Sequence, residues 1–134
     1  MYGALDISTS GLIAQRTRLE IVSANLANER SVTNAAGQYE PYRRRFAVFA
    51  PGDPARDSPE GVHVSSIEID QGPLRPEFDP GSPFADRAGY VYYPNVDPMI
   101  ELMNAMEATR AYEANISAVE ATKSMFSVAL QILA

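Results

Sequence analysis

The stretch "EATRAYEANISAVEATKSMF" (Glu107–Phe126) contains neither proline nor glycine, and the same holds for residues 99–134 as a whole. With Asp97 and Pro98 before it, the segment comprises 38 residues. As one helix it would be about 57 Å long, at about 1.5 Å per residue. A compact domain of this chain's length is only about 30 Å across. The segment therefore predicts a helix longer than a compact domain, and its apolar side needs cover from elsewhere.

Apolar side chains in this segment recur in steps of three and four residues. The row consists of Leu102, Ala105, Thr109, Tyr112, Ile116, Val119, Lys123, Phe126, Leu130 and Leu133. This spacing, kept over more than four heptads, is typical of a helix paired as a coiled coil. Asp97 is a natural N-cap and Pro98 suits the first helical position, so we expect the helix to begin there.

The first part of the chain has a heptad pattern as well. Its row consists of Leu5, Ser8, Leu12, Gln15, Leu19, Val22 and Leu26. We expect a helix over residues 4–28, with first turns weakened by Gly11. All ten prolines lie between Pro41 and Pro98, so two helical ends flank a turn-rich middle.

These patterns predict a mainly α fold with a small β-rich insertion. The N-terminal helix of the core domain falls in residues 1–36, a strand-and-turn excursion in residues 37–94, and the C-terminal helix in residues 95–134. We expect the two helices to pair as a coiled coil with a short β-hairpin and loop segment between them.

Two segments of the middle alternate like strands. "YRRRFAVFA" (42–50) places Arg43 and Arg45 on one face and Arg44 on the other. "GVHVSSIEID" (61–70) changes phase half-way, and a β-bulge at Ser65–Ser66 would bring its apolar residues to one side. Those residues are Val62, Val64, Ile67 and Ile69.

Composition and motifs argue against several functions. The net charge of −6 is unfavourable for nucleic acid and for an anionic membrane surface, and no apolar run is long enough for bilayer insertion. The N-terminus lacks the pattern of a cleaved signal peptide, so we do not expect conventional secretion. There is no cysteine, and the single histidine, His63, falls on the expected outward face of a strand. We expect no catalytic site, no metal and no cofactor.

The residues alone leave two explanations for the helices: cover by other subunits, or a self-contained bundle with the middle folded over it. We favour other subunits, because many apolar residues lie outside the paired seam. They are Ile7, Ile13, Ile21, Ile100, Met103, Met106 and Met125. A cytoplasmic homo-oligomeric coiled-coil adaptor remains an alternative. The run Arg43–Arg45 is either a solvated face or, on the sharper interpretation, a contact with acidic groups of a neighbour.

Three stretches resemble one family. Residues 4–28, "ALDISTSGLIAQRTRLEIVSANLAN", resemble the N-terminal signature of bacterial flagellar axial proteins, with Asn25 and Asn28 in its Asn-rich end. Residues 94–115, "PNVDPMIELMNAMEATRAYEAN", resemble their C-terminal signature. Residues 78–97, "FDPGSPFADRAGYVYYPNVD", resemble short rod proteins of the basal body more than distal-rod or hook subunits. Ser23 and Phe84 depart from the usual pattern.

The resemblance implies a structural subunit of the flagellar proximal rod, located in the periplasmic space. Such a subunit forms part of the drive shaft around the export channel and transmits torque. It implies helical assembly with other copies, with FlgB-like, FlgF-like and distal rod proteins, and with a FliE-like adaptor. It also implies passage through the flagellar type III export apparatus without a cleaved signal peptide.

Taken together, the heptad seams, the resemblance and the arginine face give the expected subunit-interface residues. They are Leu5, Leu12, Leu19, Val22, Asn25, Leu26, Asn28, Arg43, Arg45, Leu102, Tyr112, Ile116, Val119, Phe126, Leu130 and Leu133.

Overall fold

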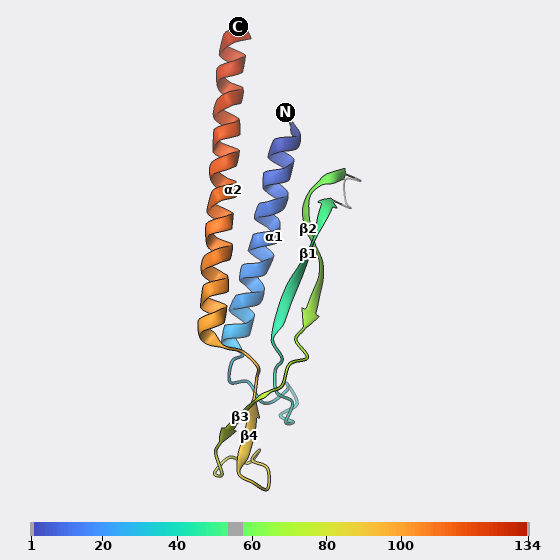
Figure 1. The fold of residues 1–134 in the computed structure, drawn as a ribbon, viewed down its shortest axis with the longest axis vertical. Helices are drawn as coiled ribbons and strands as arrows, with labels where there is room; N and C mark the ends of the chain where they lie inside the picture. The colour runs from blue at the N-terminus through green and yellow to red at the C-terminus, as the bar shows by residue number, and fades with distance from the viewer. Residues whose placement is uncertain (1, 54–57, 134) are drawn as a thin grey trace.

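The fold is given by a computed structural model that describes residues 2–53 and 58–133. Two long helices enclose four strands in chain order (Figure 1). The elements are α1 (Tyr2–Ala27), β1 (Arg45–Asp53), β2 (Ser58–Ile69), β3 (Arg75–Phe78), β4 (Tyr90–Tyr93) and α2 (Pro98–Leu133). The expected mainly α fold with a β-rich insertion is confirmed, and both helices begin and end within two residues of the expected positions.

Helix α1 lies between α2 on one side and the β1–β2 hairpin on the other (Figure 1). The helices run antiparallel, so both termini lie at one end of the molecule, and the β3–β4 hairpin lies at the other. Each hairpin is a two-stranded antiparallel sheet. Within the described residues, the buried apolar side chains are few and mostly small: Ala14, Val22, Val91, Pro94, Val96 and Ala108. The chain therefore buries little core of its own.

Side chains on the α1-facing side of α2 follow a heptad spacing, but not quite the expected one. The inward positions are Glu101, Ala105, Ala108, Tyr112, Asn115, Val119, Thr122, Phe126 and Ala129, all buried or half-buried. Four residues of the predicted row, Ala105, Tyr112, Val119 and Phe126, lie on the inward side, and five others are displaced from it by one residue. The side chain of Leu133 lies outside the described part. Leu102 and Ile116 are exposed, because the polar residues Glu101 and Asn115 take the inward places beside them.

A close approach of the helices explains this displacement. A Cβ placed on Gly11 would lie 3.0 Å from the side-chain amide of Asn115, so the Asn115 side chain packs directly on the backbone of α1. Small side chains allow such closeness and large ones prevent it. Gly11, expected to weaken the helix, lies inside α1 and permits the contact. The predicted α1 row from Leu5 to Leu26 is confirmed as buried or half-buried.

The β-bulge predicted in the second strand is present. Val48 pairs with Ser66 and Phe49 pairs with Val64, so Ser65 is the extra residue. The register sets Ile69, Ile67, Val64 and Val62 opposite alternate residues of β1, which places all four on one face. The strand expected over residues 42–50 begins only at Arg45 and continues to Asp53. Strand β3 was not anticipated, because its four residues include a proline.

Helix α2 extends past the start of α1. Gly11 is level with Asn115 and Asn25 with Glu101, fourteen residues apart on each helix. Tyr2 lies nine residues before Gly11, so it is level with about residue 124 of α2, nine residues after Asn115. Residues 125–133 therefore form an overhang of about 13 Å at about 1.5 Å per residue, visible at the C-terminal end in Figure 1. Leu130 is 65% exposed because α1 has already ended.

Candidate functional site: a buried polar junction and an open helix face

A cluster of polar side chains, which we call the polar junction, holds the C-terminal end of α1 and the N-terminal end of α2 against β1. Asn25 lies at its centre. Its side-chain Nδ2 donates to the carbonyl of Arg45 at 2.8 Å and to Oε2 of Glu101 at 3.0 Å. Its Oδ1 accepts from the Arg45 N–H at 3.0 Å and from the Tyr42 hydroxyl at 2.9 Å. All four hydrogen-bonding positions of the amide are used. The side chain pairs with the backbone of Arg45 as a neighbouring strand would.

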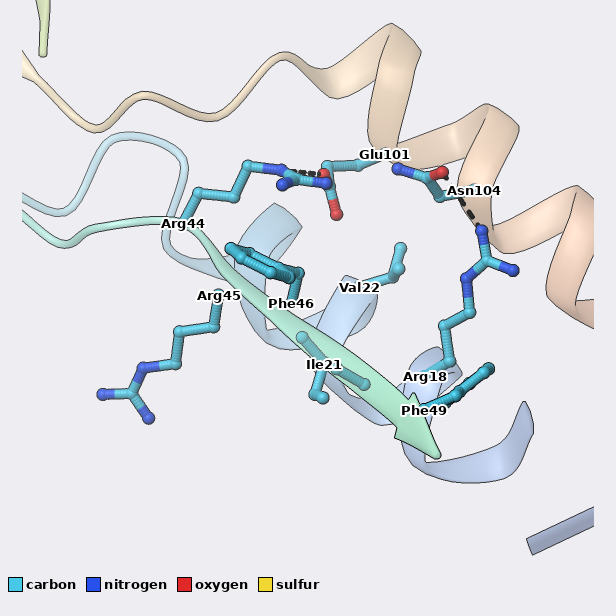
Figure 2. Close-up of a pocket in the computed structure, with 10 residues that line it drawn as sticks. Arg18, Ile21, Val22, Arg44, Arg45, Phe46, Phe49, Glu101 and Asn104 are labelled. Atoms are coloured by element: carbon cyan, nitrogen blue, oxygen red, sulfur yellow. Dashed lines mark hydrogen bonds and ion pairs between the residues drawn. The ribbon is translucent and has the colours of Figure 1, made fainter. Parts of the chain in front are cut away.

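The carboxylate of Glu101 completes this junction from α2. Glu101 is fully buried, and its Oε1 lies 2.6 Å from Nε of Arg44, whose side chain is 22% exposed. Figure 2 shows the Arg44 side chain reaching across toward Glu101. A buried carboxylate is costly without a partner. Here it has a charge-assisted bond from Arg44 and a hydrogen bond from Asn25.

Further contacts tie Arg44 to the segment that leads into α2. Its N–H donates to Oδ1 of Asn95 at 3.0 Å, and its Nη1 lies 3.8 Å from Oδ2 of Asp70. Asp97 caps α2 as predicted, accepting from Met99 N–H at 2.9 Å. The junction therefore joins α1, β1, the loop after β2 and the first turn of α2. Burial raises the pKa of the Tyr42 phenol at its edge.

The β1–β2 hairpin is attached to α1 at a second point. Ser10 Oγ accepts from the Val62 N–H at 3.0 Å and donates to the carbonyl of Ile7 at 2.7 Å. Gly61 packs against this hydroxyl with φ of +92°, a conformation that favours glycine. Together, Ser10 and Asn25 fix the hairpin along the length of α1.

Two hollows lie along this attachment. One of about 250 Å³ lies beside the junction, between the helices and β1, with Arg18 and Phe49 at its far end (Figure 2). There Arg18 donates to Glu107 at 2.9 Å and to Asn104 at 3.4 Å. Another of about 300 Å³ lies between α1 and β2. Within residues 2–53 and 58–133, no group of three or more histidine, aspartate or glutamate residues is placed to hold a metal ion.

His63 is not the surface residue that the strand pattern predicted. It is half-buried in the hollow between α1 and β2, and its Nδ1 lies 2.8 Å from the carbonyl of Gly52. The alternation of an isolated strand places His63 on the outward face, but in the structure α1 covers this part of β2. The contact with a backbone carbonyl gives His63 a structural place.

The arginine run divides as the alternation predicted. Arg44 points into the junction, while Arg43 and Arg45 line a separate hollow of about 540 Å³. Arg43 Nη1 donates to the carbonyl of Gly72 at 2.9 Å. The Arg45 guanidinium lies 5.7 Å from the centre of the Tyr42 ring, and its side chain points away from the junction (Figure 2).

Aromatic contacts fix the β3–β4 hairpin to the loop before β1. The Tyr39 hydroxyl donates to the carbonyl of Tyr92 at 3.0 Å and accepts from its N–H at 3.1 Å. Phe84, one of the departures from the family pattern, stacks on Tyr39 with ring centres 5.4 Å apart. Arg30 lies over the Tyr93 ring at 4.6 Å.

The outer side of the helix pair is the second feature, and we call it the open helix face. It is defined by the large apolar residues that are exposed on the two helices. They are Ile7, Met99, Ile100, Leu102, Met103, Met106, Ile116, Met125, Val128, Leu130 and Ile132. Ile13 is also exposed, but it lines the hollow between α1 and β2. Of the positions expected outside the seam, only Ile21 is half-buried, where the β1–β2 hairpin lies over α1. Many large apolar side chains exposed on one helix pair indicate an interaction surface.

The expected interface residues fall into three groups. Those turned inward within the subunit are Leu5, Leu12, Leu19, Val22, Asn25, Leu26, Tyr112, Val119 and Phe126. Those exposed are Arg45, Leu102, Ile116 and Leu130. Asn28 and Arg43 are half-buried, and the side chain of Leu133 lies outside the described part. Asn25 in particular is fully buried in its own subunit, so its contacts are internal.

Sequence reasoning missed the pairing of Glu101 with Arg44. From the sequence alone, Glu101 only has a favourable place near the positive end of the helix dipole, in the first turn of α2. The signal that could have found it is the heptad position of Glu101, seven residues before Ala108, on the inward row. A carboxylate there requires a buried cation.

Comparison with models of known protein families identifies the class of protein to which this chain belongs. Residues 5–29 match the family model "Flagella basal body rod protein", and residues 87–132 match "Flagellar basal body rod FlgEFG protein C-terminal". These are the stretches that form most of α1 and α2. The chain is thus a flagellar basal-body rod protein, and the expected family is confirmed.

Individual relatives identify one family within this class of rod proteins. The chain is 42% identical to the flagellar basal-body rod protein FlgC of Salmonella typhimurium, over 93% of this chain and 92% of the relative. It is 37% identical to FlgC of Borreliella burgdorferi over 99% and 97%, and 38% identical to FlgC of Bacillus subtilis over 98% and 97%. The chain belongs to the FlgC family.

This membership settles the broad function. The chain is a structural subunit of the flagellar basal-body rod and not an enzyme. Over the described residues, neither α1 nor α2 is apolar for long enough to cross a membrane.

Proposed function

We propose that the chain is a subunit of the proximal rod, where copies assemble helically with FlgB-like, FlgF-like and distal rod proteins and with a FliE-like adaptor. In this proposal the subunit leaves the cytoplasm through the type III export apparatus without a cleaved signal peptide and joins the rod in the periplasmic space. The helices line the export channel, and the assembled rod transmits torque.

The observation that carries this proposal is the open helix face. Met103 is 67% exposed and Ile132 is 80% exposed, at opposite ends of α2. No described part of the chain covers them. Covering such a surface favours association by about 25 cal/mol for each Å² of apolar area removed from water. Methionine packs well against irregular partners. A heterologous contact through this face extends into a helical array.

In this proposal, the two helices form a continuous coiled coil only after the subunit has been assembled into the rod. On α2 the inward heptad row extends to Ala129, whereas the N-terminal end of α1 is level with about residue 124 of α2. A neighbouring helix would continue the pairing along the overhang. Folding of the helix ends is then coupled to assembly, and the isolated subunit exchanges its amide hydrogens quickly there. Strong hydrogen-exchange protection throughout residues 125–133 of the monomer would contradict this coupling.

Met103→Asp tests the assembly face directly. The side chain is mostly solvated, so the isolated variant keeps its fold and stability. In the rod the charge would be buried without a partner, which costs several kcal/mol, so rods and motility should be lost. Gln71→Asp is the matched control, because it adds one charge at an exposed loop position outside both helices. Normal basal-body yields with Met103→Asp would refute the role of this face.

A further inference from the structure

The hollow beside β1 brings together two guanidinium groups without carboxylate partners. Its lining includes Arg43 and Arg45, with Tyr42, Ile69 and Leu74. Five other arginines pair with carboxylates: Arg16, Arg18, Arg30, Arg44 and Arg75. In the part of the chain that the structure describes, neither Arg43 nor Arg45 has such a partner. Two cations without an ion pair thus lie in one hollow, which one carboxylate, that of Glu40, also lines.

Both guanidinium groups make one contact within the subunit and keep free donors. Arg43 is half-buried and uses Nη1 for the Gly72 carbonyl. Arg45 lies on the ring of Tyr42, whose own hydroxyl is fixed by Asn25. A guanidinium has five N–H donors in a planar fork, so each arginine retains several. The Arg43 side chain, already held by one hydrogen bond, loses less side-chain entropy when a ligand arrives.

The surroundings define what the hollow fits. Ile69 lies opposite Arg45 in the β1–β2 register and is 49% exposed, so an apolar surface adjoins the cations. Glu40 also lines the hollow, but its Oε2 accepts from Asn34 Nδ2 at 3.0 Å. The volume, about 540 Å³, lies within the range of sites that enclose small ligands. It therefore has room for a side chain with its neighbours.

We propose that this hollow binds a carboxylate side chain, flanked by an apolar residue, from a neighbouring rod subunit. Arg43 and Arg45 supply the charge-assisted hydrogen bonds, and Ile69 and Leu74 receive the apolar neighbour. The open helix face provides most of the association, and this contact sets the register between subunits. The inference rests on the proposed assembly, but it uses a different surface, on the hairpin side of the molecule.

Arg45→Glu tests the contact, because the side chain is exposed and no described hydrogen bond depends on it. The variant should fold like the parent by circular dichroism, yet the yield of purified basal bodies should fall at least tenfold. Arg87→Glu, an exposed arginine without a described ion pair, is the control with the same charge change and should leave the yield within twofold. Equal yields for the two variants would overturn the proposal.

A photo-crosslinker at Ile69 identifies the occupant in assembled rods. We expect a crosslink to another rod subunit, mapped by mass spectrometry to a peptide with Asp or Glu beside an apolar residue, and its loss in the Arg45→Glu background. A crosslink to a peptide without a carboxylate, to nucleic acid or to no macromolecule would overturn the inference. Loss of rods with Met103→Asp but not with Arg45→Glu would remove this contact and leave the proposed function standing. Normal rods with both variants would remove both.

Discussion

Arg44 and Glu101 form a buried ion pair, with Nε and Oε1 2.6 Å apart, between the start of the β-rich insertion and the first turn of α2. The two partners differ in burial, because the Glu101 carboxylate is fully buried whereas the Arg44 side chain is 22% exposed. Removing one partner of a buried pair costs more than the pair contributes, since the remaining charge lacks compensation.

Arg44→Met should therefore destabilise the chain more than Glu101→Gln does. The first leaves a buried carboxylate with only the Asn25 amide, and we expect a loss of about 3–5 kcal/mol in the free energy of unfolding. The second leaves a partly solvated arginine with Asp70 nearby, and we expect about half that loss. Urea unfolding followed by circular dichroism gives both values. The opposite order would show that the asymmetry of burial does not govern the pair.

Asn25→Ala should destabilise the chain by about 3 kcal/mol, because it leaves the Arg45 backbone and the Tyr42 hydroxyl without partners inside the junction. Asn28→Ala serves as the comparison. Asn28 belongs to the same sequence signature, but its side chain only donates to the Ala24 carbonyl one turn back. We expect less than about 0.5 kcal/mol there. Similar losses for both asparagines would contradict the central place of Asn25.

Tyr42→Phe removes one hydrogen bond to Asn25 and should cost about 1 kcal/mol at neutral pH. Burial raises the pKa of Tyr42 above its ordinary value of 10.0. Since the folded-state pKa is the higher one, this group's contribution is fully present below the unfolded pKa and is lost as the pH rises through the folded pKa. The difference in stability between parent and variant should therefore shrink at strongly alkaline pH. A difference that grows there would show the opposite sign.

Gly11→Ala should destabilise the helix pair although alanine favours helices by about 1 kcal/mol over glycine. The added Cβ would meet the Asn115 amide at 3.0 Å, and that side chain is held by a 2.8 Å bond to the Ala111 carbonyl. In an Asn115→Ala background the contact disappears, and Gly11→Ala should then stabilise the chain by about 1 kcal/mol. Thermal unfolding of the four proteins completes the cycle. Equal effects in both backgrounds would exclude the close approach.

Ending the chain after Phe126 should leave the unfolding free energy within about 0.5 kcal/mol of the parent, because the overhang extends past α1. Assembly should nevertheless fail, since the overhang carries exposed Val128, Leu130 and Ile132. Basal-body counts and denaturant unfolding measured together separate the two effects. A large loss of stability in the isolated chain would show that the overhang packs within the subunit.

Local features of the fold followed from the sequence. Asp97 and Pro98 mark the start of α2 by capping chemistry, and the phase change at Ser65–Ser66 locates the bulge. The exposure of Met103, Met106 and Met125 also followed from the heptad count. Each depends on residues near one another in the chain, so the sequence contains the information directly.

By itself, the sequence determined the two helices, the bulged hairpin, the apolar outer surface and the resemblance to flagellar rod proteins. Only the tertiary structure decided that α1 lies between α2 and the hairpin, that Gly11 meets Asn115, and that Glu101 rather than Leu102 faces inward. The inward row is set by how closely two helices approach and by whether a buried carboxylate finds a cation. Both conditions join residues 57 or more positions apart, and periodicity within one helix carries no record of its partner's shape or charge.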